Sequence, residues 1–91
     1  MWKYRLDVRD IWGKTKDGEM SLADFCTVVV KRIDTLLESM GLLDRMWLKD
    51  IRNSIAELAV DSFPEVEDFD DIWDDLYDWA NSARCWVATT F

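Results

Sequence analysis

The two ends of the chain carry the patterns of β-strands. Residues 2–6 alternate between apolar and basic side chains with a period of two, which predicts a half-buried strand. Residues 85–91 are rich in β-branched and aromatic side chains without helical spacing, and they predict a second strand. Because isolated strands are unstable, we expect these two to pair with each other against the helices. The sequence leaves open the direction of this pairing, and also a partner strand from another molecule.

Four helical patterns lie between the strands, over residues 7–16, 21–40, 44–61 and 68–82. Each begins at a residue whose side chain can cap a helix N-terminus, namely Asp7, Ser21, Asp44 and Asp68. The first pattern ends at the turn-forming pair Asp17-Gly18, the second at Gly41, and the third before Pro64. The second pattern is the clearest, because its apolar residues recur three and four positions apart over five turns.

We expect one side of each helix to be buried. In the first two helices the buried residues are Val8, Ile11, Trp12, Leu22, Phe25, Cys26, Val29, Ile33, Leu36, Leu37 and Met40. In the last two they are Trp47, Leu48, Ile51, Ile55, Leu58, Ala59, Phe69, Ile72, Trp73, Leu76, Tyr77 and Ala80. These patterns predict a mainly α fold (α+β) in a single domain, residues 1–91, with four helices and a small two-stranded sheet joining the N- and C-terminal strands. Without that pairing the fold would be an all-α bundle with extended tails.

The composition excludes several kinds of catalytic chemistry. The chain has no histidine, which removes the most common general acid–base group at neutral pH and the usual partner of a serine or cysteine nucleophile. Its two cysteines, Cys26 and Cys85, are too few for a structural zinc site, and we interpret both as small buried apolar side chains. A disulfide between them stays open. The acidic segment from Asp70 lacks the glycine and glutamate of a calcium-binding loop. We expect no enzyme, no cofactor and no metal site.

The charge is distributed unevenly along the chain. The formal net charge is −8, and residues 1–52 contain ten basic and nine acidic residues. Residues 53–91 contain ten acidic residues and one basic residue, Arg84. Binding to phosphates needs clustered basic side chains, so we expect no direct binding of nucleic acid. The imbalance favours a basic protein partner or serves only solubility.

The fourth helix concentrates this acidity on the face opposite its apolar residues. Its acids between Glu67 and Asp78 span about 16–17 Å, or one charge per ~2.4 Å, against one per ~1.7 Å in duplex DNA. Like charges four positions apart repel, and a purely structural surface would include lysines. The acidic face could therefore occupy a groove that binds a nucleic-acid backbone, or it could simply be a solvated surface. The candidate partner-binding residues are Glu67, Asp70, Asp71, Asp74, Asp75, Asp78 and Trp79.

The chain also contains six tryptophans. We expect Trp12, Trp47 and Trp73 in the core, because they lie on the apolar sides of their helices. Trp79 lies off the apolar stripe, and it is either an exposed anchor for a partner or packed under the terminal sheet. We expect Trp2 and Trp86 to pair across that sheet.

The chain shows no signal for a membrane or for export. No apolar run approaches the 18–20 residues of a membrane span, and the first residues lack the apolar core of a signal peptide. We therefore expect no membrane association and a location in a cytoplasm.

Three segments resemble parts of small acidic hypothetical proteins of tailed bacteriophages. They are Lys3 to Trp12, Asp68 to Trp79 with its Asp-Ile-Trp and Leu-Tyr-Asp-Trp groups, and Cys85-Trp86-Val87, about a third of the chain. The resemblance implies a phage or prophage origin and carries over no catalytic residue. Because such proteins are often inhibitors of host enzymes or defence systems, anti-CRISPR proteins included, it implies by analogy a function of that kind.

Together these observations predict a non-enzymatic binding protein of the host cytoplasm. Its acidic fourth helix would block a basic surface, one that handles nucleic acid, on a host or defence protein such as a CRISPR effector. The alternative is a phage structural or assembly factor, for example a homodimer, whose acidity serves only solubility. The sequence does not determine the oligomeric state.

Overall fold

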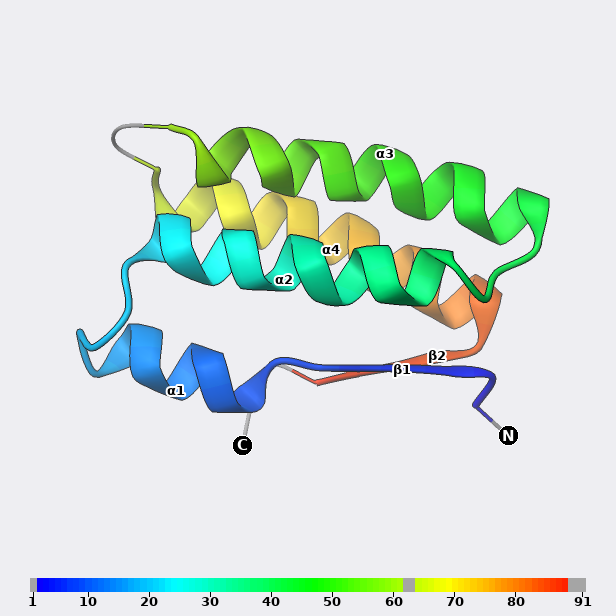
Figure 1. The fold of residues 1–91 in the computed structure, drawn as a ribbon, viewed down its shortest axis with the longest axis horizontal. Coiled ribbons are helices and arrows are strands. Elements are labelled where there is room, and N and C mark those ends of the chain that lie inside the picture. Colours follow the sequence, from blue (N-terminus) through cyan, green and yellow to red (C-terminus); the bar gives the residue numbers. More distant parts are fainter. Residues whose placement is uncertain (1, 62–63, 89–91) are drawn as a thin grey trace.

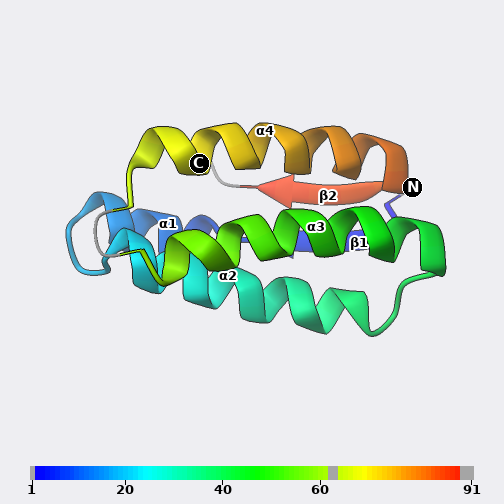
Figure 2. The ribbon, with the colours of Figure 1, turned by 90° about the horizontal axis from the view of Figure 1, so that it is seen from above.

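The computed structural model describes residues 2–61 and 64–88, and it confirms a mainly helical fold with a small terminal sheet (Figure 1). The elements in chain order are β1 (Tyr4–Asp7), α1 (Arg9–Lys16), α2 (Leu22–Leu37), α3 (Leu42–Ala59), α4 (Val66–Ala83) and β2 (Cys85–Ala88). α3 packs against both α2 and α4, and the sheet lies beneath these helices (Figures 1 and 2). The fold measures 35 × 26 × 20 Å.

The sheet joins the two ends of the chain in parallel. Tyr4 lies opposite Cys85 and Asp7 lies opposite Ala88. The backbone N–H of Lys3 donates to the Arg84 carbonyl at 2.7 Å, and that of Val8 donates to the Ala88 carbonyl at 3.0 Å. The terminal strands therefore pair with each other, and their direction is parallel.

β1 is shorter than its pattern predicted, and the register of the sheet corrects one expected pair. β1 begins at Tyr4 instead of residue 2, and residues 89–91 of the expected second strand lie outside the described residues. Trp86 lies opposite Arg5, so the expected pairing of Trp2 with Trp86 is wrong. The reason is that Trp2 lies before the start of β1, and the register that pairs Tyr4 with Cys85 places Trp86 opposite Arg5.

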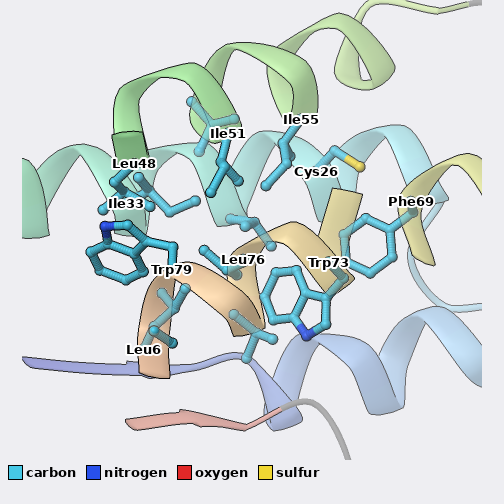
Figure 3. Packing of buried hydrophobic residues seen from close by; sticks show 14 of the residues in the cluster. Leu6, Cys26, Ile33, Leu48, Ile51, Ile55, Phe69, Trp73, Leu76 and Trp79 are labelled. Atoms are coloured by element: carbon cyan, nitrogen blue, oxygen red, sulfur yellow. The ribbon is translucent and has the colours of Figure 1, made fainter. Parts of the chain in front are cut away.

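The core is built from the inner faces of all six elements (Figure 3). Its fully buried side chains include Leu6, Val8, Phe25, Cys26, Val29, Ile33, Leu48, Ile55, Phe69, Leu76 and Trp79. At one end the rings form an aromatic cluster, in which the Phe69 ring centroid lies 4.9 Å from that of Phe25, 5.7 Å from that of Trp12 and 5.1 Å from that of Trp73. Both cysteines are buried and free, so there is no disulfide between them.

The expected cap of α2 is confirmed, but its expected end is wrong. The Ser21 hydroxyl accepts the backbone N–H of Asp24 at 3.1 Å. α2 ends at Leu37 instead of Met40. Gly41 is the extended N-cap of α3, with φ −70°, and does not terminate α2 in the left-handed conformation. The residues after Leu37 are needed to reverse the chain so that α3 can pack back along α2.

Three further helix starts differ from the expected ones. Asp7 belongs to β1, although its carboxylate still accepts the backbone N–H of Arg9 at the start of α1. α3 and α4 begin two residues before Asp44 and Asp68, so these two acids lie in the first helical turn instead of capping it. An acid in the first turn still stabilises a helix through the exposed N–H groups there, which is why the sequence signal resembled a cap.

The buried faces are narrower than expected at several apolar positions. Leu36, Met40 and Ile72 are half-buried, and Tyr77 is 37% exposed. Trp12 is also half-buried, although its ring packs on the aromatic cluster. Met40 lies beyond the end of α2, and the other four residues lie at the margins of their helix stripes.

Replacing Ile33 by alanine tests the α2 stripe. Ile33 is completely buried, so Ile33→Ala should lower the free energy of unfolding by about 2–5 kcal/mol, through lost burial and the cavity left behind. Val60→Ala is the control, because Val60 is 85% exposed and should change stability by no more than about 0.5 kcal/mol. Urea unfolding measures both, and a similarly small loss for Ile33→Ala would contradict its place in the core.

Arg84, between α4 and β2, offers a test of backbone strain. It is the one described non-glycine residue with positive φ, at 59°, in the left-handed region that terminates α4. Because this conformation costs a residue with a Cβ about 1–2 kcal/mol, and glycine loses about 0.5–1 kcal/mol more entropy on folding, Arg84→Gly should stabilise the fold by up to about 1 kcal/mol. Arg84→Ala keeps the Cβ and should gain nothing. Equal unfolding midpoints for the two variants would refute the strain.

Candidate functional site

The candidate site is the solvent-facing side of α4, which we call the acidic face. Buried residues recur three and four positions apart along this helix, at Phe69, Trp73, Leu76, Ala80 and Ala83. Seven of the other positions are acids, and all seven are exposed: Glu67, Asp68, Asp70, Asp71, Asp74, Asp75 and Asp78. Within this set, the residues at 67, 71, 74 and 78 form one straight row, because spacings of four, three and four return to the same side of a helix. The structure therefore brings the six predicted acids together on one surface.

No basic side chain neutralises the acidic face within the part of the chain that the structure describes. The four ion pairs among these residues join Asp7, Asp10 and Asp34 to arginines of β1, α1, α2 and α3. α4 itself contains no lysine or arginine. The carboxylates thus repel one another along the helix without compensation, and this costs a few tenths of a kcal/mol for each pair four positions apart.

Trp79, a predicted site residue, does not lie on the acidic face. Its side chain is 0% exposed, and its indole N–H donates to the Asp44 backbone carbonyl at 3.0 Å, at the start of α3. Of the two alternatives for Trp79, the exposed anchor is therefore wrong. The physical reason is that α4 is covered from two sides, by α3 and by β2, so its buried sector is wider than the apolar stripe alone indicated.

Trp47 is the exposed tryptophan beside the acidic face, although the sequence placed it in the core. Its side chain is 45% exposed. It lines a hollow of about 310 Å³ between α3 and α4, together with Asp50, Ile51, Ser54, Ile72 and Asp75. One signal could have located it. The first two turns of α3 contain more apolar residues than one buried stripe can hold.

Those extra residues form a second exposed feature, which we call the α3 patch: Leu42, Leu43, Met46 and Trp47. Leu42 is 73% exposed, Leu43 84% and Met46 59%. They are consecutive or four positions apart, so they share one side of the first two turns of α3. Contiguous exposed apolar side chains are typical of interaction surfaces.

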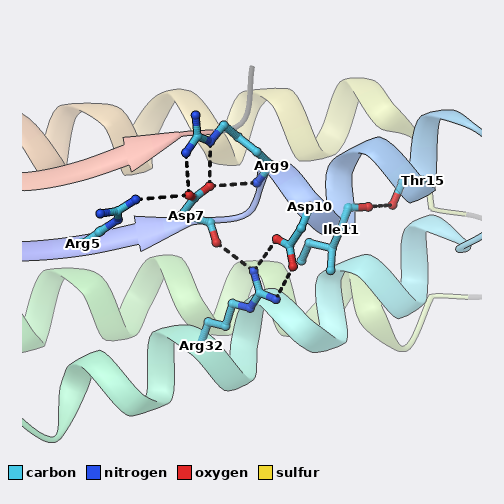
Figure 4. A network of polar contacts seen from close by, with 7 residues as sticks. All are labelled: Arg5, Asp7, Arg9, Asp10, Ile11, Thr15 and Arg32. Atoms are coloured by element: carbon cyan, nitrogen blue, oxygen red, sulfur yellow. Dashed lines mark hydrogen bonds and ion pairs between the residues drawn. The ribbon is translucent and has the colours of Figure 1, made fainter. Parts of the chain in front are cut away.

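A separate polar network lies at the sheet and the start of α1, and in it each carboxylate is paired with an arginine (Figure 4). The Asp7 carboxylate accepts hydrogen bonds from the Arg9 guanidinium at 2.8 and 3.0 Å, and Arg5 approaches it to 3.6 Å. Arg5 and Arg9 also lie over the Trp86 ring, with Cζ 4.5 and 5.2 Å from its centroid. Arg32 of α2 donates to Asp10 and to the Asp7 carbonyl. This network fastens β1 and α1 to α2.

Hydrogen bonds from the Arg9 side chain, and then from the Arg9 backbone, hold the pKa of Asp7 well below its usual range. Hydrogen bonds from Arg32 likewise lower the pKa of Asp10. Burial raises the pKa of Cys26 and of Cys85 to about 11, so both thiols stay protonated at neutral pH. A protonated, buried thiol is a poor nucleophile.

The described residues contain no group of three or more cysteine or acidic side chains placed to hold a metal ion. None of the described helices is long and apolar enough to cross a membrane.

No protein family, no curated protein and no solved structure matches the chain.

Acid titration tests the polar network. Asp7 has a lower pKa in the folded protein than in the unfolded chain, so it stabilises the fold above the unfolded pKa of about 3.9, and this contribution is lost as the pH falls below that value. Asp7→Asn should therefore destabilise the protein most at pH 7, and the loss should shrink between about pH 5 and pH 2. Asp17→Asn, outside the network, is the control. Urea unfolding at several pH values measures both, and a pH-independent loss for Asp7→Asn would exclude the carboxylate as its cause.

Proposed function

We propose that the protein is a non-enzymatic binding protein of phage type, whose acidic face blocks a basic surface on a host or defence protein. The target surface is one that handles nucleic acid, such as that of a CRISPR effector, in the cytoplasm of the host. The observation that carries the proposal is the set of seven exposed carboxylates on α4, none of which forms an ion pair with another described residue. The phage assignment comes from the resemblance of the chain's segments and not from the fold.

The spacing of these charges supports an electrostatic mechanism. One carboxylate per ~2.4 Å along α4 is close to the ~1.7 Å charge spacing of duplex DNA, so a groove built for phosphates would attract this helix. Fields of one sign also steer a partner into place and raise the association rate.

The chemistry of the remaining residues supports a binding function. The chain contains no histidine, and its two thiols are buried with raised pKa values. Apart from Asp75, which lines the hollow between α3 and α4, the acids of α4 lie on an exposed helix face, whereas paired catalytic carboxylates work in a cleft that holds the substrate.

The α3 patch favours a second candidate, an assembly factor that forms a homodimer through apolar contacts while its acidity provides solubility. The dependence of binding on salt concentration distinguishes the two functions. Electrostatic blockade weakens steeply as the ionic strength rises past about 0.1–0.2 M, whereas apolar self-association does not.

Substitutions that remove negative charge but keep the side-chain shape test the acidic face. The variant Asp71→Asn, Asp74→Asn, Asp75→Asn and Asp78→Asn preserves the shape of α4 and changes the formal net charge from −8 to −4. Its stability should be equal or slightly higher, because repulsion along the helix is relieved. Binding to the partner captured from a host lysate should show a slower association rate and a flatter dependence on salt, measured by surface plasmon resonance.

A matched control separates placement from total charge. Asp17→Asn, Glu19→Gln, Asp24→Asn and Glu38→Gln also give a net charge of −4 but change exposed acids outside α4. This control should keep most of the wild-type association rate. If the two variants slow association equally, only net charge matters, and unchanged affinity of the α4 variant at low salt would leave the acidic face a solvated surface.

A further inference from the structure

The hollow between α3 and α4 joins the α3 patch to the acidic face. Its α3 side is formed by Trp47, Asp50 and Ser54, which are three and four positions apart, together with Ile51. Its α4 side is formed by Ile72, half-buried, and Asp75, exposed at the edge of the acidic face. One exposed indole thus lies in the same hollow as two carboxylates, one from each helix.

The cations of α3 lie on the other side of that helix. Arg45, Lys49 and Arg52 are three and four positions apart and so share one side. Arg52 pairs with Asp34 of α2, its Nε lying 2.9 Å from the carboxylate, so this is the side that faces α2. None of the residues lining the hollow is basic. The hollow therefore has a negative charge with no resident cation, next to an aromatic ring.

We propose that this hollow binds an arginine side chain of the protein partner, with the guanidinium stacked on Trp47 and paired with Asp50 and Asp75. The inference deepens the proposed function, on which it rests, by assigning a specific contact to the basic surface. Guanidinium is the protein cation that combines a flat, weakly hydrated face for an indole with donors for carboxylates, whereas the ammonium of lysine is compact and strongly hydrated. The volume of about 310 Å³ lies at the lower end of the range for ligand pockets.

The α3 patch accounts for how such a contact would be strengthened. Leu43 and Met46 continue the apolar surface away from Trp47, and the acidic face continues from Asp75 in the other direction. A partner segment with an arginine between apolar and further basic residues would match this order of chemistry. Aromatic and apolar anchors surrounded by polar rims are typical of the residues that dominate binding energy.

Short peptides of defined charge test the proposal on the intact chain. The probes are the acetylated, amidated tetrapeptides of arginine, of lysine and of citrulline, the uncharged isostere of arginine. ¹⁵N-labelled protein gives one indole N–H signal for each tryptophan, and the Trp47 signal is assigned by its loss in Trp47→Phe. The arginine peptide should shift the Trp47 signal and bind about 2- to 5-fold more tightly than the lysine peptide, the range that a cation–π contact at an exposed site supplies. The citrulline peptide should leave the signal unmoved.

Single variants that each remove one negative charge show where the peptide binds. Asp50→Asn and Asp75→Asn each remove one negative charge from the hollow, and Asp70→Asn removes one from the acidic face outside it. The first two should weaken the arginine peptide more than Asp70→Asn does. Trp47→Ala should remove the preference for arginine over lysine while retaining charge-dependent binding. Thermal melting verifies that each variant is folded, and Trp47→Phe, which keeps a ring, should retain part of the preference.

Other outcomes would overturn the proposal without overturning the proposed function. If arginine and lysine peptides bind equally, and the three single variants weaken them equally, the acidic face attracts cations without an arginine site. If the chain dimerises in analytical ultracentrifugation, and Trp47→Ala raises the dimer dissociation constant, the patch is covered by a second copy. A different result would contradict the proposed function itself, namely that the four-asparagine α4 variant binds its captured partner with unchanged affinity at low salt.

Discussion

The parallel pairing of β1 with β2 is the constraint on which the rest of the structure depends. Parallel strands cannot be joined by a tight turn, so the chain between them must cross the whole molecule and return to the same end. α1 continues in the direction of β1, and α2, α3 and α4 then run back and forth along the fold (Figures 1 and 2). Because the number of these antiparallel helices is odd, the chain leaves α4 at the end of the molecule where β1 begins. Arg84 therefore lies beside Lys3, and β2 begins there.

This route decides which surfaces remain exposed. α4 is the last pass, in contact with α3 on one side and with β2 on another, so only its outer sector faces solvent. The acids occupy that sector, and Trp79 is enclosed on the α3 side. α3 is covered by α2 and α4 but by nothing on its remaining side among the described residues, which leaves the α3 patch exposed next to the acidic face.

Charge is handled differently in the two halves of the chain. At the sheet, Asp7 and Asp10 each pair with arginines, and their hydrogen bonds connect three elements. On α4 the carboxylates have no such partners among the described residues, and they reduce the stability of the helix that carries them. This cost is concentrated on one face, beside the exposed Trp47.

The sequence by itself determined the four helices, the two terminal strands, the Ser21 cap, the burial of both cysteines and the exposure of the α4 acids. These features follow from local periodicity and capping, which depend on residues a few positions apart. Only the tertiary structure decided the parallel direction of the sheet, the end of α2 at Leu37, and the exchange of roles in which Trp79 is buried and Trp47 exposed. Helical spacing indicates the centre of a buried face, but its width depends on how many neighbours cover the helix, and that number is set by the path of the whole chain.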